Sequence, residues 1–153
     1  MPEKPIAIAS DHGGFELKTL LIEELKALGH QVLDLGCHSL DSVDYPDYAA
    51  TLAAALADGR SDRGVILCGT GIGISIAANR YAHVRAALCH NGLTARLARQ
   101  HNDANVLALG GRILGSELAK DCLREFLATP FEGGRHARRV AKLAASVDQR
   151  EKV

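Results

Sequence analysis

Residues 64–80 hold the side chains and spacings most suited to chemistry, and they read GVILCGTGIGISIAANR. An apolar run at 65–67 predicts a buried strand that ends at Cys68. Three alternating glycines follow it: Gly69, Gly71 and Gly73. Without Cβ atoms, successive backbone N–H groups at this spacing can converge on one point, and the start of a following helix adds partial positive charge. Such surroundings favour a thiolate, so the pattern predicts a base beside an anion-binding cage, which suits proton abstraction from carbon.

Other readings of this segment are a structural cysteine and a nucleotide-binding loop. A cysteine at the end of a buried strand is often a small core side chain. A G-x-G-x-x-G fingerprint counted from Gly69 needs a glycine at 74, where the chain has Ile74. Residues 88–94 also lack the acidic residue that this fingerprint places about twenty positions further on. No Gly-Lys-Ser/Thr sequence is present, so a P-loop is excluded.

Composition narrows the class of protein. The 153 residues predict one domain over 1–153, and 18 basic against 18 acidic side chains give no charge that would attract nucleic acid or a membrane. The start of the chain has no signal-peptide pattern, so we expect a cytoplasmic protein. The histidines show no ligand spacing, so we expect no metal and no cofactor. The cysteines are dispersed, as in reduced proteins without a disulfide framework: Cys37, Cys68, Cys89 and Cys122.

Short apolar runs alternate with helical patterns along the chain. The predicted strands are Ile6–Ser10, Gln31–Leu35, Gly64–Cys68, Val84–Cys89 and Asn105–Leu109. The predicted helices are an apolar stripe of Leu17, Leu20, Leu21, Leu25 and Leu28 closed by Gly29, and the segments Tyr48–Ala57, Leu93–Arg99 and Glu117–Leu127. This alternation predicts an α/β, three-layer Rossmann-like fold, with a five-stranded parallel sheet and helices on both faces.

One further helix, predicted over residues 136–150, has no strand after it. It follows Pro130 and the pair Gly133-Gly134, and its apolar face comprises Val140, Leu143, Ala144 and Val147. Such a helix either covers its own domain or projects and contacts a partner chain.

Ligands of open α/β sheets bind beyond the carboxyl ends of the strands. The polar residues that we expect there lie in Ser10–Gly14, Asp44–Asp47, Cys68–Thr70, Arg99–Asp103 and Gly110–Arg112, followed by Arg135, His136, Arg138 and Arg139. Singly each has an ordinary explanation, such as a helix cap at Asp11. Together they offer a base, acids, an anion cage and arginines, which suits the isomerisation of a sugar phosphate.

Five of these segments resemble ribose-5-phosphate isomerase type B and the wider family that includes allose- and galactose-6-phosphate isomerases. They are 10–15 (SDHGGF), 44–46 (DYP), 68–79 (CGTGIGISIAAN), 99–103 (RQHND) and 132–136 (EGGRH). The resemblance implies interconversion of D-ribose 5-phosphate and D-ribulose 5-phosphate through a cis-enediolate, a step of carbohydrate metabolism in the pentose phosphate pathway. It also implies a metal-independent homodimer, or a dimer of dimers, with shared active sites.

The resemblance assigns the proton transfer to the glycine loop. Cys68 is the base that moves a proton between C1 and C2. Part of the family uses a glutamate further along this loop, but residues 72–77 contain Ser75 as their one polar side chain, so the cysteine version applies. Backbone N–H groups of Gly69, Gly71, Ile72 and Gly73 hold the enediolate oxygens. Thr70 relays a proton between those oxygens.

Other positions match the ring-opening and binding residues. His101, with Asp11 nearby, matches the acid/base that opens the furanose ring. Asn102 matches a hydroxyl contact. Phosphate and substrate contacts fall on His12, Arg112, Arg135 and Arg139, since arginine forks suit phosphate geometry. Tyr45 and His136 belong to the same cleft.

Two other classes of protein share parts of this pattern. The first is a receiver or flavodoxin-like binding module. A receiver needs an aspartate at the end of the third strand, where the chain has Cys68. A flavin-binding loop usually exposes aromatic side chains, and the chain has only three Phe and three Tyr. A non-catalytic subunit of a two-chain isomerase is the second, and turnover by the pure protein separates the two cases. The sequence leaves open whether a five- or a six-carbon sugar phosphate, such as allose or galactose 6-phosphate, is preferred.

Overall fold

The computed structural model describes residues 2–145, in which strands and helices alternate as predicted. The strands are β1 (Ile6–Ser10), β2 (Val32–Asp34), β3 (Gly64–Cys68), β4 (Ala86–Leu88) and β5 (Val106–Gly110). The helices are a 3-10 turn η1 (His12–Gly14), α1 (Phe15–Ala27), α2 (Tyr45–Ala57), α3 (Ile72–Ala78), α4 (Gly92–Asn102), α5 (Ser116–Ala128) and α6 (Arg135–Leu143). None of these described helices combines the length and the apolarity that crossing a membrane requires.

All five strands form one parallel sheet in the order β2-β1-β3-β5-β4, which confirms the predicted fold class. The register pairs Gly64 with Val106 at one end of β3 and Cys68 with Gly110 at the other. Because the strands are parallel, their carboxyl ends share one edge of the sheet, called here the carboxyl edge. The opposite side is the amino edge.

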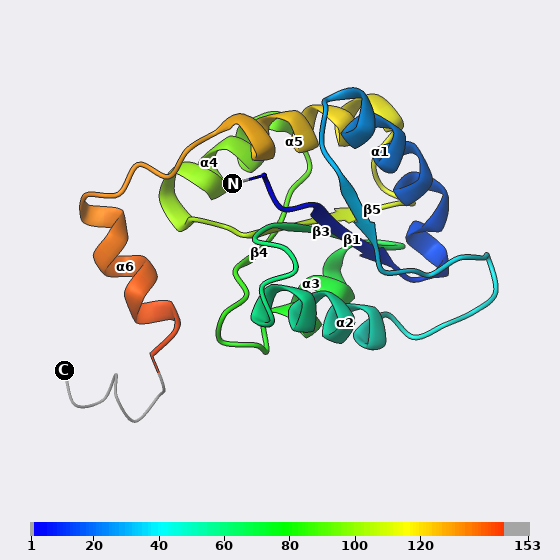
Figure 1. Ribbon diagram of the computed structural model, residues 1–153, viewed down its shortest axis with the longest axis horizontal. Helices are drawn as coiled ribbons and strands as arrows, with labels where there is room; N and C mark the ends of the chain where they lie inside the picture. Colours follow the sequence, from blue (N-terminus) through cyan, green and yellow to red (C-terminus); the bar gives the residue numbers. More distant parts are fainter. Residues whose placement is uncertain (1, 146–153) are drawn as a thin grey trace.

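Helices cover both faces of the sheet, with α1, α4 and α5 on one face and α2 and α3 on the other (Figure 1). Successive side chains of a strand point to opposite faces. In β3, Val65 and Leu67 pack with the first helix layer, whereas Ile66 and Cys68 pack with the second. The alternation therefore places the Cys68 side chain on the face that α2 and α3 cover.

Some boundaries differ from those expected. The second helix begins at Tyr45 rather than Tyr48, because Pro46 fits the first turn of a helix and does not interrupt it. Leu20 in α1 and Leu28 directly after it are 47% and 43% exposed, since only one side of the predicted stripe meets the sheet. Gly29, with φ of 90°, follows the end of this helix as expected.

The last helix, α6, does not lie on the sheet but projects from the body of the molecule (Figure 1). It packs against α4, and His136 is its one buried residue. Its apolar Leu143 is 58% exposed. The described part of this helix therefore packs on α4 through His136 and leaves an apolar side chain exposed. Val147 and the rest of the predicted helix beyond 145 lie outside the described residues.

At the carboxyl edge, turns that contain glycine meet backbone to backbone. A Cβ atom added at Gly110 would lie 2.5 Å from the carbonyl oxygen of Thr70, and one at Gly111 would lie 2.6 Å from that of Gly13. A Cβ at Gly13 would lie 2.9 Å from the nitrogen of Gly69. The turns after β1, β3 and β5 thus leave no room for side chains at these positions.

We expect Gly110→Ala to lower the free energy of unfolding by about 3 kcal/mol, because the Thr70 backbone cannot yield to the new methyl group without moving the whole turn. Gly115→Ala is the matched control, since a Cβ there meets nothing within 4 Å. Its cost should not exceed about 1 kcal/mol, from the weaker N-cap of α5. Urea unfolding measures both, and equal losses would contradict the tight packing of the turns.

Candidate active site

Cys68 ends β3 at the carboxyl edge, where its thiol faces the glycine loop. The side chain is 4% exposed, and the Gly71 N–H donates a hydrogen bond to Sγ at 3.1 Å. Gly71 adopts φ of 77°, a left-handed conformation that favours glycine, and α3 begins directly after it. The loop therefore directs the Gly71 N–H at the sulfur.

Thr70 and Tyr45 complete the wall of this loop. The Thr70 Oγ1 accepts a hydrogen bond from the Ile72 N–H at 3.2 Å, and Thr70 is exposed. Tyr45, in the first turn of α2, lays its ring on the loop, since a Cβ at Gly73 would lie 2.7 Å from Tyr45 Cζ. The structure thus brings both side chains to the same loop as Cys68.

Asp11 and His12 follow β1 at this edge. Asp11 Oδ1 accepts hydrogen bonds from the N–H groups of Gly13 (2.9 Å) and Gly14 (3.2 Å), so the predicted helix cap is present. His12 Nδ1 accepts one from the Val43 N–H at 3.2 Å, which leaves Nε2 to carry the proton of the neutral ring. Both residues line a cleft of about 500 Å³. Its other side chains include Tyr45 and the exposed carboxylates Asp44 and Asp47.

Arg112 brings a cation to the carboxyl edge. Its N–H donates to the Gly69 carbonyl at 2.9 Å, just beyond the end of β5. Its side chain extends over the same glycine, because a Cβ at Gly69 would lie 3.2 Å from Nη1. A thiol, backbone N–H groups, a hydroxyl and a guanidinium therefore gather on one small area, which suits a reaction that passes through an oxyanion.

An ion pair between the buried Lys18 and the partly exposed Asp34 supports the turn that packs behind β1. Lys18 is 1% exposed and its Nζ lies 2.6 Å from Asp34 Oδ1, which also accepts from the Gly36 N–H at 3.0 Å. Burial favours the neutral acid, but the bonds from Lys18 and Gly36 outweigh it and hold the pKa of Asp34 below its usual value. The Gly36 carbonyl in turn accepts from the Ser10 N–H at 2.7 Å. The pair thus anchors the backbone next to Asp11.

The expectation that residues 99–103 lie at the carboxyl edge is wrong. In a parallel sheet, a helix that precedes a strand ends at the amino end of that strand, and α4 leads into β5 in this way. The length of β5 alone, about 13 Å at 3.3 Å per residue, separates its two ends. His101 and Asn102 therefore do not meet Cys68 or Asp11 within one chain.

His101 instead belongs to a second cluster, between the end of α4 and the start of α6. Its ring stacks on that of His136, with centroids 4.5 Å apart and planes 10° apart. Arg139 lines the same cavity of about 270 Å³. Glu132 Oε2 lies 3.6 Å from His136 Nε2. Sequence analysis did not assign a role to Glu132, although its spacing of four residues from His136 could have indicated the pair.

The ring geometry of this cluster bears on metal binding. The two imidazoles and the Glu132 carboxylate have their nearest ligand atoms within 4.8 Å of one another. A metal ion lies in the plane of each imidazole that binds it, and stacked parallel planes do not meet at one ion. Burial lowers the pKa of His136, with Arg135 and His101 acting in the same direction. The arrangement suits an N–H of His136 directed at the Glu132 carboxylate better than a metal ion shared by both rings.

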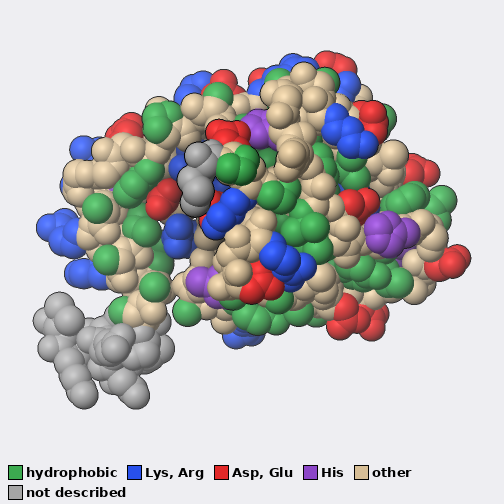
Figure 2. Space-filling model, viewed as in Figure 1, with side chains coloured by type: hydrophobic (Ala, Val, Ile, Leu, Met, Phe, Trp, Pro, Cys, Tyr) green, Lys and Arg blue, Asp and Glu red, His purple; other side chains and the backbone are tan. Residues whose placement is uncertain are grey.

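The side chains of α6 are strongly basic. Figure 2 shows Lys and Arg side chains along the outward side of this helix, which carries Arg135, Arg138, Arg139 and Lys142 and no acidic residue. Within residues 2–145, none of these four forms an ion pair. Arg135 and Arg139 are four residues apart and thus share one side of the helix. This side can bind an anion such as a phosphate.

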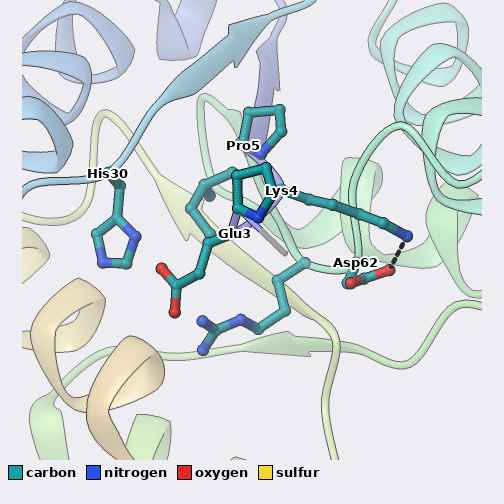
Figure 3. Close-up of a pocket in the computed structure, with 8 residues that line it drawn as sticks. Glu3, Lys4, Pro5, His30 and Asp62 are labelled. Atoms are coloured by element: carbon teal, nitrogen blue, oxygen red, sulfur yellow. Dashed lines mark hydrogen bonds and ion pairs between the residues drawn. The ribbon is translucent and has the colours of Figure 1, made fainter.

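A separate hollow of about 320 Å³ lies at the amino edge, where the chain enters β1 and β3 (Figure 3). Its Lys4 is paired with Asp62 at 2.9 Å, and Glu3 and His30 face the same space (Figure 3). The described residues that line it include no glycine. A base here would lack the anion cage that proton abstraction from carbon needs, so the carboxyl edge remains the candidate site.

Comparisons with known proteins identify the family of the chain. Residues 6–143 match the family model described as Ribose/Galactose Isomerase. The chain is 48% identical to ribose-5-phosphate isomerase B of Escherichia coli, over 96% of this chain and 98% of that protein. It is similar to the structure of Clostridium thermocellum ribose-5-phosphate isomerase B, with a TM-score of 0.91, 49% identity and coverage of 97% and 98%. It is 44% identical to D-erythrulose-4-phosphate isomerase of Pectobacterium atrosepticum, over 90% and 91%.

We expect iodoacetamide to alkylate Cys68 before the other three cysteines. All four thiols are free and buried, but burial raises the pKa of Cys89, and it raises that of Cys122 to about 12. Cys68 differs in having a backbone N–H directed at its sulfur. Mass mapping of tryptic peptides at short reaction times measures the order, and a substrate should protect Cys68 alone. Earlier labelling of Cys89 or Cys122 would contradict this prediction.

Proposed function

The chain belongs to the ribose/galactose isomerase family and is an aldose–ketose isomerase that interconverts D-ribose 5-phosphate and D-ribulose 5-phosphate, and we propose that Cys68 is its base. The observation that carries this proposal is the hydrogen bond from the Gly71 N–H to the Cys68 sulfur at the end of β3. This bond supports the proposal because a backbone N–H directed at the sulfur favours the thiolate. The four free cysteines fit a cytoplasmic enzyme, where a thiol base stays reduced.

In the proposed reaction, the Cys68 thiolate removes the proton from C2 of the open-chain aldose. The electrons move to the carbonyl oxygen and form a cis-enediolate, and the same thiol then returns the proton to C1. Thr70 carries a proton between the two oxygens. The N–H groups of the glycine loop and the Arg112 guanidinium balance the developing negative charge, so this mechanism calls for no metal ion.

The binding residues at the carboxyl edge surround the same substrate. We assign His12 Nε2–H and Arg112 to phosphate or hydroxyl oxygens, since His12 lines the cleft and the Arg112 guanidinium lies over Gly69. Tyr45 packs over Gly73 and forms the wall against which the sugar lies. Asp11 uses only Oδ1 in its helix cap, so its second oxygen can accept a hydrogen bond from the substrate.

The remaining residues of the site come, in our proposal, from a second copy of the chain. His101 and Asn102 lie at the amino edge, and Arg135 and Arg139 lie on the projecting helix α6. In such a homodimer, the amino edge and α6 of one copy would meet the carboxyl edge of the other. A two-fold axis repeats this contact, so both sites would be complete. His101 would then open the furanose ring. The arginines would bind the phosphate as a fork.

We expect Cys68→Ala to lower kcat for ribose 5-phosphate by about 10²–10⁴-fold, the usual effect of removing a general base. Cys122→Ala is the matched control, because Cys122 packs on the opposite face of the sheet from Cys68. A coupled assay measures both, with far-UV circular dichroism to check the fold. Retention of most of the parent rate by Cys68→Ala would contradict the assignment of the base.

The same assay includes erythrulose 4-phosphate, allose 6-phosphate and galactose 6-phosphate, because a 44% identical relative is named for the first of these. Ribose 5-phosphate should have the highest kcat/KM of the four. A higher value for another sugar would leave the chemistry at Cys68 unchanged and reassign the substrate.

Sites shared between two chains predict rescue in mixed dimers. We expect Cys68→Ala chains refolded with His101→Ala/Asn102→Ala chains to regain about a quarter of parental activity, because half the random dimers are mixed and each carries one intact site. Cys68→Ala chains refolded with Arg135→Ala/Arg139→Ala chains should regain the same fraction of activity.

Cys68→Ala refolded with Cys68→Ser is the control for this experiment, since both lesions lie at one position and no dimer contains an intact site. Native mass spectrometry confirms the exchange of subunits. If neither of the two test mixtures recovers activity although mixed dimers form, each site is built within one chain.

A further inference from the structure

The stacked histidine pair, His101 and His136, has an acidic neighbour whose function is unassigned. His136 is 5% exposed, and its Nε2 has no hydrogen-bond partner among the described residues. Glu132 Oε2 lies 3.6 Å from this nitrogen, just beyond hydrogen-bond range. We propose that Glu132 is a positioning residue that keeps one proton on the stacked pair and, through His136, holds His101 in the orientation for ring opening. This inference rests on the proposed role of His101.

The charges around the pair explain why an acid is needed. Arg135 and Arg139 are close to His136 on its own helix, and His101 stacks on it from α4. Each of these groups opposes a positive charge on His136, as burial does. Within residues 2–145, Glu132 is the one group found to favour that charge, and it comes from the connection between α5 and α6. The carboxylate therefore opposes the effect of burial and of the neighbouring cations on His136.

Stacking disfavours two positive charges on the pair. Two imidazolium rings with centroids 4.5 Å apart repel each other. An imidazolium that opens a furanose ring must donate a proton to the ring oxygen. A pair that Glu132 holds in its singly protonated state supplies this donor. The same stack restricts the rotation of the half-buried His101 ring.

The backbone keeps Glu132 next to the pair. Its N–H donates to the Gln100 carbonyl at 3.1 Å, one residue before His101. Arg99 holds the neighbouring turn, since Nη1 binds Asp103 Oδ1 at 2.9 Å and Nε donates to the Thr129 carbonyl at 3.2 Å. The Glu132 side chain is 49% exposed and can move the short distance to Nε2. Glu132→Gln therefore removes a charge and retains the backbone anchor.

We expect Glu132→Gln to lower the first titration midpoint of the pair by about one pH unit, the lower end of the effect of a nearby opposite charge. Imidazole Cε1–H resonances measure this midpoint by NMR. The alkaline limb of kcat/KM should move to lower pH by the same amount, with kcat falling about tenfold on that limb and KM changing little. Glu132→Asp should restore most of the shift. Glu125→Gln, which removes a carboxylate paired with Arg96, is the control and should leave the midpoint unchanged.

Loss of kcat/KM by the same factor at every pH, with an unchanged NMR titration, would overturn this inference and reduce Glu132 to a structural role. The proposed function fails in a different way. If His101→Gln has the parental rate, His101 does not open the ring, whereas the NMR titration still decides whether Glu132 holds a proton on the pair.

Discussion

Close contact between backbones at the carboxyl edge determines how the site is built. The turns after β1, β3 and β5 touch one another through atoms that a Cβ at Gly13, Gly110 or Gly111 would displace. This contact brings the main-chain N–H groups and the Cys68 thiol into one small area, and it allows Arg112 to reach over Gly69. A site made mainly of backbone donors is rigid, because its groups are held by the sheet itself.

The direction of the strands divides the remaining functional residues between two ends of the molecule. Residues that follow a strand reach the carboxyl edge, and residues that precede one reach the amino edge. Cys68 belongs to the first group and His101 to the second, since one ends β3 and the other ends the helix before β5. In an open parallel sheet, a reaction that needs both groups calls for a second copy of the chain, and the projecting helix α6 is consistent with that requirement.

Charged side chains with little exposure anchor the segments around each group. The Lys18–Asp34 pair supports the backbone beside Asp11 at the carboxyl edge. Arg99 binds the end of α4 and the end of α5 at once, which holds the turn that carries His101. Both arrangements join elements distant in sequence. Their hydrogen bonds replace those that the charged groups would make to water, which offsets the cost of burying them.

The sequence alone determined the fold class, the glycine loop and the thiol beside it, because these depend on local periodicity and on residues adjacent in the chain. It misjudged the start of α2 at Tyr45 and placed His101 at the wrong edge of the sheet. It also passed over Glu132. Only the tertiary structure decided which ends of the elements meet and which side chains stack. The direction of the strands assigns each helix end to an edge of the sheet, and the packing of residues far apart in sequence brings side chains such as His101 and His136 together.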